Sequence, residues 1–168
     1  MIRSLALPSL SLAVVFPCFA TDRTTLNALI AQHAQANRVP EALVHRVIKR
    51  ESGYDPNASS RGNLGLMQIR LGTARGVGYT GSAAGLFDAN TNLTYAVTYL
   101  ANAYSVAGGN PERAISLYSS GYYYAAKRQG LLAQLRKANT APTNTASISV
   151  TTSSDGLSSR IHVAHPTP

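Results

Sequence analysis

The sequence predicts a mainly α-helical domain with little or no β-sheet. Apolar residues recur every three or four positions in several segments between residues 21 and 137, which is the spacing of amphipathic helices. No segment alternates apolar and polar residues in the manner of a half-buried strand. Hydrophobic residues make up 45% of the chain's 168 residues, enough to bury the core of one domain. We therefore expect a single helical domain over residues 21–137.

The first twenty residues have the features of an export signal. Arg3 supplies a positive charge, Leu5 to Phe16 is largely apolar, and small residues at positions 18 and 20 suit a cleavage site. The apolar run is too short to span a membrane as a helix, which takes about 20 residues. We expect residues 1–20 to be a signal peptide, the mature chain to lack a transmembrane segment, and its location to be periplasmic or extracellular.

Two alternatives for this segment remain open, a buried N-terminal helix and a lipid anchor on Cys18. Pro17 directly before the cysteine fits a lipoprotein signal poorly, so we favour removal of the signal. Cys18 is the chain's single cysteine, so the mature chain would have no disulfide and no thiolate metal site.

The chain is basic, with a formal net charge of +8, or +7 once Arg3 is lost with the signal. A basic exported protein suggests an anionic partner, and a nucleic acid, a membrane surface and a cell-wall polymer all qualify. The sequence has neither a long run of Lys and Arg nor a known nucleic-acid-binding signature. We therefore expect no nucleic acid partner.

Two helices are predicted before residue 53. The first is indicated by residues at helical spacing: Leu26, Leu29, Ile30 and His33. The second is predicted to begin at Pro40, which suits a first helical position, and to end before Gly53 and Pro56. Its apolar stripe consists of Leu43, Val44, Val47 and Ile48.

A glycine-punctuated loop is expected over residues 62–78, and any sheet should be small. A long helix then carries Leu93, Val97, Leu100 and Tyr104 on one stripe, and Gly108-Gly109 ends it. Asn110-Pro111-Glu112 predicts another helix start, because a capping side chain, a proline and an acid follow in order. That helix should end near Gly121.

The end of the chain is predicted to hold one more helix and a tail. The helix is expected from Leu131 to Lys137. Residues 138–168 are rich in Thr, Ser, Ala and Pro, and we expect them to form a disordered tail. His162 and His165 lie there and give only a weak metal signal.

Glu51 breaks the pattern of the second helix. It lies four residues after Val47 and seven after Val44, and so falls on the apolar face. Burial disfavours the charged form of a carboxyl group, and a carboxylic acid that is protonated near neutral pH is what a general acid in glycoside cleavage needs. The alternatives are that Glu51 turns outward at the helix end, or that it pairs with a base such as Arg61.

The neighbourhood of Glu51 favours the catalytic interpretation. Four segments follow in order: Glu51 to Ala58, Gly65 to Ile69, Ala96 to Leu100, and Leu117 to Gly121. Together they resemble the soluble lytic transglycosylase family, over roughly residues 39–128. The resemblance implies a goose-lysozyme-like helical fold and an enzyme that cuts the glycan strands of peptidoglycan, with Glu51 as its acid and base.

The sequence departs from the family pattern at several positions. The last motif usually has Ala and Asn where this chain has Leu117 and Ser119. Residues 122–124 are all tyrosine, where the family often has Gly or Pro, so the far end of the groove is expected to differ. The stretch between Ala58 and Gly65 is about one residue shorter than the common pattern.

A count of acids bears on the mechanism. Glycoside cleavage by two carboxyl groups needs them about 5–5.5 Å or about 6.5–9.5 Å apart. The other acids after residue 20 are Asp22, Glu41, Asp55, Asp88, Glu112 and Asp155. None of them is an obvious partner for Glu51, although Asp55 and Asp88 stay open as candidates. The resemblance implies a route with one acid, in which the N-acetyl group of the substrate assists and the product is a 1,6-anhydro sugar. This route needs no metal or organic cofactor.

The resemblance also implies roles for four further residues. Ser52 would hydrogen-bond near the sugar, Met67 and Gln68 would line the groove beside Glu51, and Tyr118 would approach Glu51 and help to hold it. The plain alternatives are that Met67 fills the core and that Tyr118 is a packing residue.

Two other functions stay open: a lysozyme-type hydrolase on the same fold, which uses water, and a non-catalytic peptidoglycan-binding module. The sequence does not tell whether such a protein serves growth, a phage, or a secretion or pilus assembly of the cell envelope, nor whether it cuts at ends or within strands.

Overall fold

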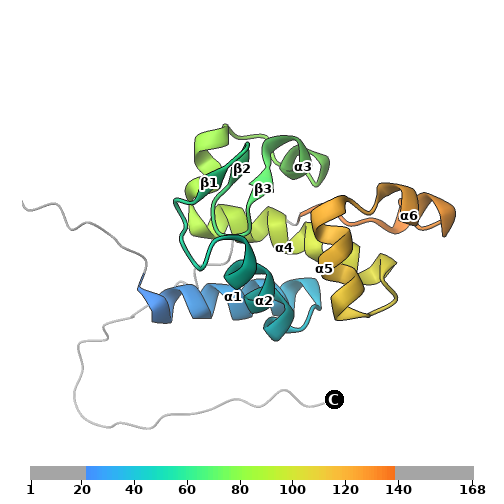
Figure 1. Cartoon of the computed structure of the whole chain (residues 1–168), viewed down its shortest axis with the longest axis horizontal. Helices are drawn as coiled ribbons and strands as arrows, with labels where there is room; N and C mark the ends of the chain where they lie inside the picture. The colour runs from blue at the N-terminus through green and yellow to red at the C-terminus, as the bar shows by residue number, and fades with distance from the viewer. Residues whose placement is uncertain (1–21, 139–168) are drawn as a thin grey trace, which may run out of the picture.

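Helices form most of the structure, a computed structural model that describes residues 22–138 (Figure 1). The α-helices in that range are α1 (Arg23–Asn37), α2 (Glu41–Glu51), α3 (Leu71–Gly76), α4 (Ala89–Val106), α5 (Pro111–Ser120) and α6 (Tyr123–Arg128). Two 3-10 turns lie at Ala83–Phe87 (η1) and Leu132–Gln134 (η2). The mainly helical fold class is therefore confirmed. The predicted signal peptide and the predicted tail beyond Ala138 lie outside the described residues.

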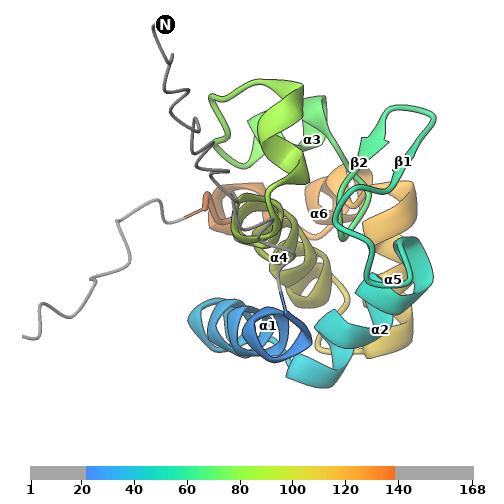
Figure 2. The same cartoon turned by 90° about the vertical axis from the view of Figure 1, so that its left-hand side faces the viewer.

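Helix α4 runs through the middle of the molecule. The sheet and α3 lie on one side of it, and α1 and α2 lie on the other (Figures 1 and 2). It packs against α1, α3, α5 and η1. Buried residues occur all around α4, as expected of a core helix. Leu93, Val97 and Leu100 of the predicted stripe are fully buried, whereas Tyr104 is half-buried.

Capping side chains mark the starts of α4 and α5, and the start predicted at Asn110-Pro111-Glu112 is confirmed. The Asp88 Oδ1 atom accepts a hydrogen bond from the Thr91 N–H at 2.7 Å and begins α4. The Asn110 Oδ1 atom accepts one from the Arg113 N–H at 3.0 Å and begins α5. Helix α2 begins one residue later than predicted, because Pro40 is its cap and not its first helical residue.

The small sheet occupies part of the predicted loop. Strands β1 (Ser59–Ser60), β2 (Asn63–Leu64) and β3 (Ile69–Arg70) are antiparallel and lie in that order. Arg61 and Gly62 connect β1 to β2, and both have positive φ, at 51° and 81°, as the two-residue turn of a hairpin favours. The sheet holds the chain between α2 and α4 in a fixed path.

The prediction of a helix from Leu131 to Lys137 is wrong, because only the single turn η2 forms there. Asn102 of α4 engages the backbone there, because its Oδ1 accepts from the Arg136 N–H at 2.8 Å and its Nδ2 donates to the Arg136 carbonyl at 3.0 Å. These bonds replace the ones that a helix would make. Helix α6 was not predicted, since its tyrosines are modest helix formers, and it is held by burial of Ala125 and Ala126.

Candidate active site

A cleft opens where the end of α2 meets the sheet, α3, α4 and the end of α5. Its volume is about 460 Å³. The residues that line it are mostly polar: Arg50, Glu51, Asn63, Gln68, Ile69, Arg70, Thr73, Tyr99, Tyr118, Ser119, Ser120 and Gly121. The cleft brings together residues that lie up to 71 positions apart in the sequence.

Glu51 is the last residue of α2 and lines this cleft. Its side chain is 23% exposed, because the helix face that it shares with Val44 and Val47 is turned to the core. The cation near it is its chain neighbour Arg50, with 3.8 Å between Nε and Oε1, and not Arg61. Since the Arg50 side chain is itself 56% exposed, solvent weakens this pair. Glu51 is therefore partly buried and open to a ligand in the cleft.

Glu51 is the single acid among the residues that line the cleft. Asp55 accepts a hydrogen bond from the Asn57 N–H at 2.8 Å in the turn after α2. Asp88 caps α4, and Glu112 pairs with Arg46 at 2.7 Å. Asp55 and Asp88, which the sequence left open as partners of Glu51, thus have structural roles outside the cleft. This arrangement favours chemistry that uses one carboxyl group.

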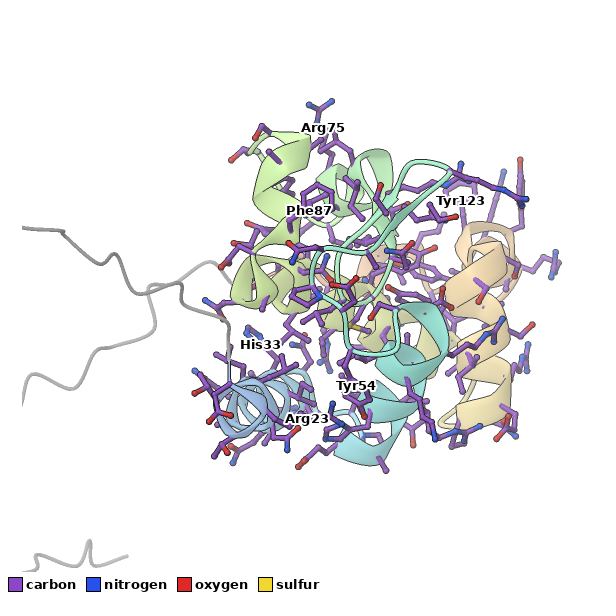
Figure 3. The ribbon with its side chains drawn as sticks, turned by 60° about the vertical axis from the view of Figure 1, so that its left-hand side comes forward. Arg23, His33, Tyr54, Arg75, Phe87 and Tyr123 are labelled. Atoms are coloured by element: carbon purple, nitrogen blue, oxygen red, sulfur yellow. The ribbon has the colours of Figure 1, made fainter. Side chains whose placement is uncertain are left out.

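The turn that follows Glu51 is held in an unusual conformation. Tyr54 has a φ of 73°, which is costly for a bulky residue and needs support from its surroundings. Two contacts supply it. The Arg23 guanidinium lies 3.8 Å from the centre of the Tyr54 ring, and the Tyr54 hydroxyl lies 3.0 Å from the His45 Nδ1 atom (Figure 3). The start of α1 therefore helps to fix the chain just after the candidate catalytic residue.

Ser52 supports the cleft and is not among the residues that line it. Its hydroxyl donates to the Leu66 carbonyl at 2.7 Å, and its Oγ accepts from the Tyr54 N–H at 3.2 Å. It thus ties the end of α2 to the loop between β2 and β3. These bonds give Ser52 a structural role. Its expected role beside the sugar remains a prediction.

Met67 and Gln68, which were expected to line the groove together, are placed differently. The Met67 side chain is fully buried and is absent from the cleft lining, so it fills the core, as the plain alternative had it. Gln68 lines the cleft, and its Nε2 donates to the carbonyls of Ala58 and Gly65, each at 2.9 Å. Gln68 has a φ of 48°, which is costly for a residue other than glycine, and these two side-chain bonds help to stabilise that conformation.

Tyr118 lines the cleft and is 8% exposed. Its hydroxyl donates to the Met67 carbonyl at 2.8 Å, so it bonds to the loop beside Glu51 and not to Glu51 itself. Burial raises the pKa of Tyr118 well above 10, and the negative charges of Glu51 and Tyr99 raise it further. Tyr118 is therefore a neutral donor at ordinary pH.

Asn92 is a residue that the sequence argument missed. It is fully buried in α4, and its Oδ1 accepts from the Met67 N–H at 3.0 Å. Its Nδ2 donates to the carbonyls of Leu64 and Leu86 at 2.9 and 2.8 Å. The sequence did not single it out, because Asn90, Thr91 and Thr94 beside it are polar as well. Asn92 fixes the loop that carries Gln68.

Gly65 faces Asn92 in this loop. It has a φ of 69°, and an added Cβ would lie 2.3 Å from the Leu86 carbonyl oxygen and 2.4 Å from the Asn92 Nδ2 atom. The glycine of the Gly65-Leu66-Met67-Gln68 motif is therefore required by this close approach.

Four lining residues lie outside the segments that carried the family resemblance, and the sequence argument missed them: Arg50, Asn63, Arg70 and Thr73. The Arg70 Nε donates to the Asn63 Oδ1 at 3.0 Å, which places a guanidinium on the sheet side of the cleft. The Tyr99 ring packs against Tyr118, with 5.3 Å between ring centres, and burial raises its pKa. Nothing in the spacing of these residues along the sequence marks them as neighbours.

The family model of the transglycosylase SLT domain matches residues 28–140, most of the chain. The chain belongs to this family. The match confirms the resemblance that was drawn from the motifs, and with it a lysozyme-like, mainly helical fold. No solved structure matches the chain. Membership of the SLT-domain family indicates a lytic-transglycosylase type of activity related to peptidoglycan.

Two further features concern only the described part of this SLT domain. Within residues 22–138, no group of three or more His, Cys, Asp or Glu side chains is placed to hold a metal ion. In the same range, each helix is too short or too polar to cross a bilayer.

Proposed function

We propose that this chain is a lytic transglycosylase that cleaves the bond between N-acetylmuramic acid and N-acetylglucosamine in peptidoglycan, without water. The proposal rests above all on Glu51, which is the one carboxyl group in the lining of a polar cleft. A second carboxylate for the ordinary two-acid route is absent from that lining. One group must then act as acid and as base in turn.

In the first step, protonated Glu51 gives its proton to the bridging oxygen. The bond from this oxygen to C1 of the muramic sugar breaks, and the N-acetylglucosamine end leaves as an alcohol. The carbonyl oxygen of the substrate's own N-acetyl group then shares the positive charge at C1. The substrate thereby takes the place of the second carboxyl group.

In the second step, ionised Glu51 takes the proton from the C6 hydroxyl of the same muramic sugar. The C6 oxygen attacks C1, which closes the 1,6-anhydro ring and releases the N-acetyl oxygen. Glu51 ends protonated, so the cycle can repeat without a cofactor. Because the attacking hydroxyl belongs to the sugar, the cleft must hold this sugar in place against C1.

The residues around Glu51 support such positioning. Ser52, Gln68 and Tyr118 each hydrogen-bond to the backbone of the segment from Ala58 to Met67. The backbone beside Glu51 is thus fixed before a substrate arrives, which lowers the entropic cost of binding. Removal of one such bond should disturb the alignment more than the fold.

We further propose that the protein acts in the periplasm or outside the cell. The support is the signal-like composition of residues 1–20 and the location of its substrate class. A partner in a secretion or pilus assembly of the cell envelope fits the same location. Fractionation of cells that express the full chain would test the location, and recovery in the cytoplasm at full length would contradict it.

The decisive experiment is mass spectrometry of purified peptidoglycan after digestion by the protein and by a Glu51→Gln variant. The variant keeps the size of the side chain and removes its proton transfer. We expect 1,6-anhydro ends from the wild type and none from Glu51→Gln, which should still bind and fold.

The other outcomes identify the competing functions. Ordinary reducing ends would show a lysozyme-type hydrolase on the same fold. Retained binding without any product from the wild type would show a non-catalytic peptidoglycan-binding module. Products from Glu51→Gln at the wild-type rate would remove Glu51 from its proposed role.

A further inference from the structure

Helix α6 lies at the edge of the molecule and presents aromatic and basic side chains there (Figure 1). Ala125 and Ala126 of this helix are buried. Two pairs of exposed residues, four positions apart, share the opposite side of the helix, and we call them the α6 face: Tyr123, Tyr124, Lys127 and Arg128. Tyr123 lies far from Arg23 and His33 of α1 (Figure 3).

The exposed apolar side chains of the described residues gather at this face. Within residues 22–138 the large hydrophobic side chains that remain exposed are Tyr123 at 55%, Tyr124 at 73% and Leu132 at 36%. The two tyrosine rings pack edge-on with 5.3 Å between their centres, and Tyr123 and Leu132 line the same hollow. Exposed apolar side chains that gather in one place, unlike scattered ones, are typical of a binding surface.

The surroundings of these apolar side chains are basic. Residues 122–137 include four Lys or Arg and no Asp or Glu, which gives this segment a formal charge of +4. Arg136 and Lys137 each donate to a backbone carbonyl, whereas the ion pairs among residues 22–138 involve neither Lys127 nor Arg128. The two cations of the α6 face are therefore available to an anionic partner.

The face is held in place by buried contacts behind it. The Tyr122 hydroxyl accepts a hydrogen bond from the Asn102 Nδ2 atom of α4 at 3.1 Å, and the Leu131 N–H donates to the Ala126 carbonyl at 2.9 Å. The α6 face and Leu132 are thus arranged before a partner arrives, which lowers the entropic cost of binding.

We propose that the α6 face, together with Leu132, binds the surface of a membrane that carries anionic lipids. Tyrosine rings favour the boundary between headgroups and acyl chains, because one end of the side chain is apolar and the other is polar. Lys and Arg attract anionic headgroups, and their stems lie along apolar surface. Apolar side chains beside available cations match such a lipid surface in both respects.

The charge of the α6 face argues against a second copy of the chain as its partner, because two surfaces of the same sign repel each other. Docking on a membrane would also place the cleft near the lipid, since Gly121 of the cleft lining lies two residues before Tyr123. The inference does not depend on the chemistry proposed at Glu51, because binding to lipid involves no turnover.

The test is co-sedimentation of the protein with phosphatidylcholine vesicles, with and without about 30% phosphatidylglycerol. We expect binding to the anionic vesicles and at least about tenfold weaker binding to the neutral ones. Tyr123→Ala should lower the partition onto anionic vesicles about fivefold, because it removes a ring from the interface. Lys127→Gln combined with Arg128→Gln should lower it about twentyfold, since each cation near such a surface contributes about a fivefold gain.

Arg38→Gln combined with Lys49→Gln is the matched control. Both residues are exposed, Arg38 at the end of α1 and Lys49 on α2, and their replacement removes the same charge from the chain. Exposed charges more than a Debye length from the lipid are largely screened, so a change below about twofold is expected. Thermal unfolding should show that all these variants fold as the wild type does.

A fluorescent reporter tests where the ring lies. The chain contains no tryptophan, so Tyr123→Trp gives a single reporter. Its emission should move to shorter wavelength on anionic vesicles and should be quenched by brominated lipids, as expected of a ring at the acyl boundary. Gln32→Trp, exposed on α1, should show neither effect.

Several results would overturn the inference. Absence of binding to the anionic vesicles is one, and equal losses in the α6 double variant and in the matched control are another. The same variants are sedimented with purified peptidoglycan, and if they lose that binding but keep the binding to vesicles, the α6 face serves the cell wall and not a membrane. An inactive wild type that binds the vesicles as expected would reject the proposed function alone.

Discussion

Ser119 is the residue at which the cleft wall departs from the usual family motif, which has Asn at this position. Its side chain is exposed in the cleft, and its hydroxyl is used in a bond to the Ile115 carbonyl of its own helix at 3.2 Å. An amide at this position would present both a donor and an acceptor to a sugar. We predict that Ser119→Asn lowers KM for peptidoglycan strands about threefold and leaves kcat unchanged.

The free energy of unfolding should tell whether the substitution changes only the cleft and not the fold. A surface substitution of this kind is expected to change the free energy of unfolding by less than about 0.5 kcal/mol. Steady-state kinetics with Ser119→Asn, and with Ser116→Asn as a control that is exposed on α5 but outside the cleft lining, would test the prediction. An unchanged KM would mean that the sugar does not approach position 119.

The buried tyrosines predict how stability changes at high pH. Burial raises the pKa of Tyr122 to about 12, although a hydrogen bond from Asn102 lowers it in part. Burial also raises the pKa of Tyr118 well above 10. In the unfolded chain both titrate near 10. Above that pH the unfolded chain has lost protons that the folded chain keeps, so the free energy of unfolding falls as pH rises.

We therefore predict that full stability is kept up to about pH 10 and is lost progressively toward about pH 12. Urea unfolding across this range would measure the decline, and Tyr122→Phe should make it shallower. Tyr124→Phe, exposed on α6, should leave the wild-type decline unchanged. An identical pH dependence in Tyr122→Phe and wild type would contradict the assignment.

Single residues were predictable where their type conflicted with a local pattern. Glu51 stood out because a carboxyl group continued an apolar stripe, and the structure places it in the cleft. Asn92 is a fully buried amide on a core helix, but it did not stand out, because Asn90 and Thr91 precede it and Thr94 follows it. Arg70 and Thr73 gave no such signal, because their place in the cleft depends on how distant segments pack.

Among the secondary-structure elements, too, some were predictable from the sequence and others were not. Helices α1, α2, α4 and α5 are long enough to repeat their apolar spacing, so periodicity and capping residues predicted them. The two-residue strands are too short for any alternation, and the hairpin at Arg61-Gly62 is fixed by backbone geometry. The failure at Leu131–Lys137 came from a tertiary contact, the paired bonds of Asn102 with Arg136.

The loop between β2 and β3 depends on α4 through Asn92. Replacement by Leu, of similar size, would leave the Met67 N–H and the Leu64 and Leu86 carbonyls without their partner. Each buried group left unpaired costs about 1–3 kcal/mol, so we predict a loss of about 3–5 kcal/mol in the free energy of unfolding. Activity should fall with it, because the same loop positions Gln68 in the cleft.

Chemical denaturation of Asn92→Leu beside Asn57→Leu would measure this loss. Asn57 is exposed, so its substitution should cost less than about 0.5 kcal/mol. Similar stabilities for the two variants would mean that the loop is held by other contacts.

At the scale of the whole molecule, the positive charge of the chain bears on the binding of an anionic polymer. The described residues carry a formal net charge of +7, because the charged residues outside them are Arg3, Asp155 and Arg160. Arg50 and Arg70 bring part of this charge to the cleft. Peptidoglycan carries carboxylates on its peptide stems, and these are a counterpart for the two guanidinium groups.

Salt should therefore weaken the proposed binding of peptidoglycan. Ions screen attraction between exposed charges, so we predict that affinity of the Glu51→Gln variant for peptidoglycan falls severalfold between about 50 and about 500 mM salt. Co-sedimentation with purified peptidoglycan would measure it. Arg70→Gln in this background should reduce the salt dependence, whereas Arg75→Gln, exposed on α3 but outside the cleft lining, should reduce it less. Affinity that ignores salt would mean that the basic character of the chain serves a partner other than the glycan strand.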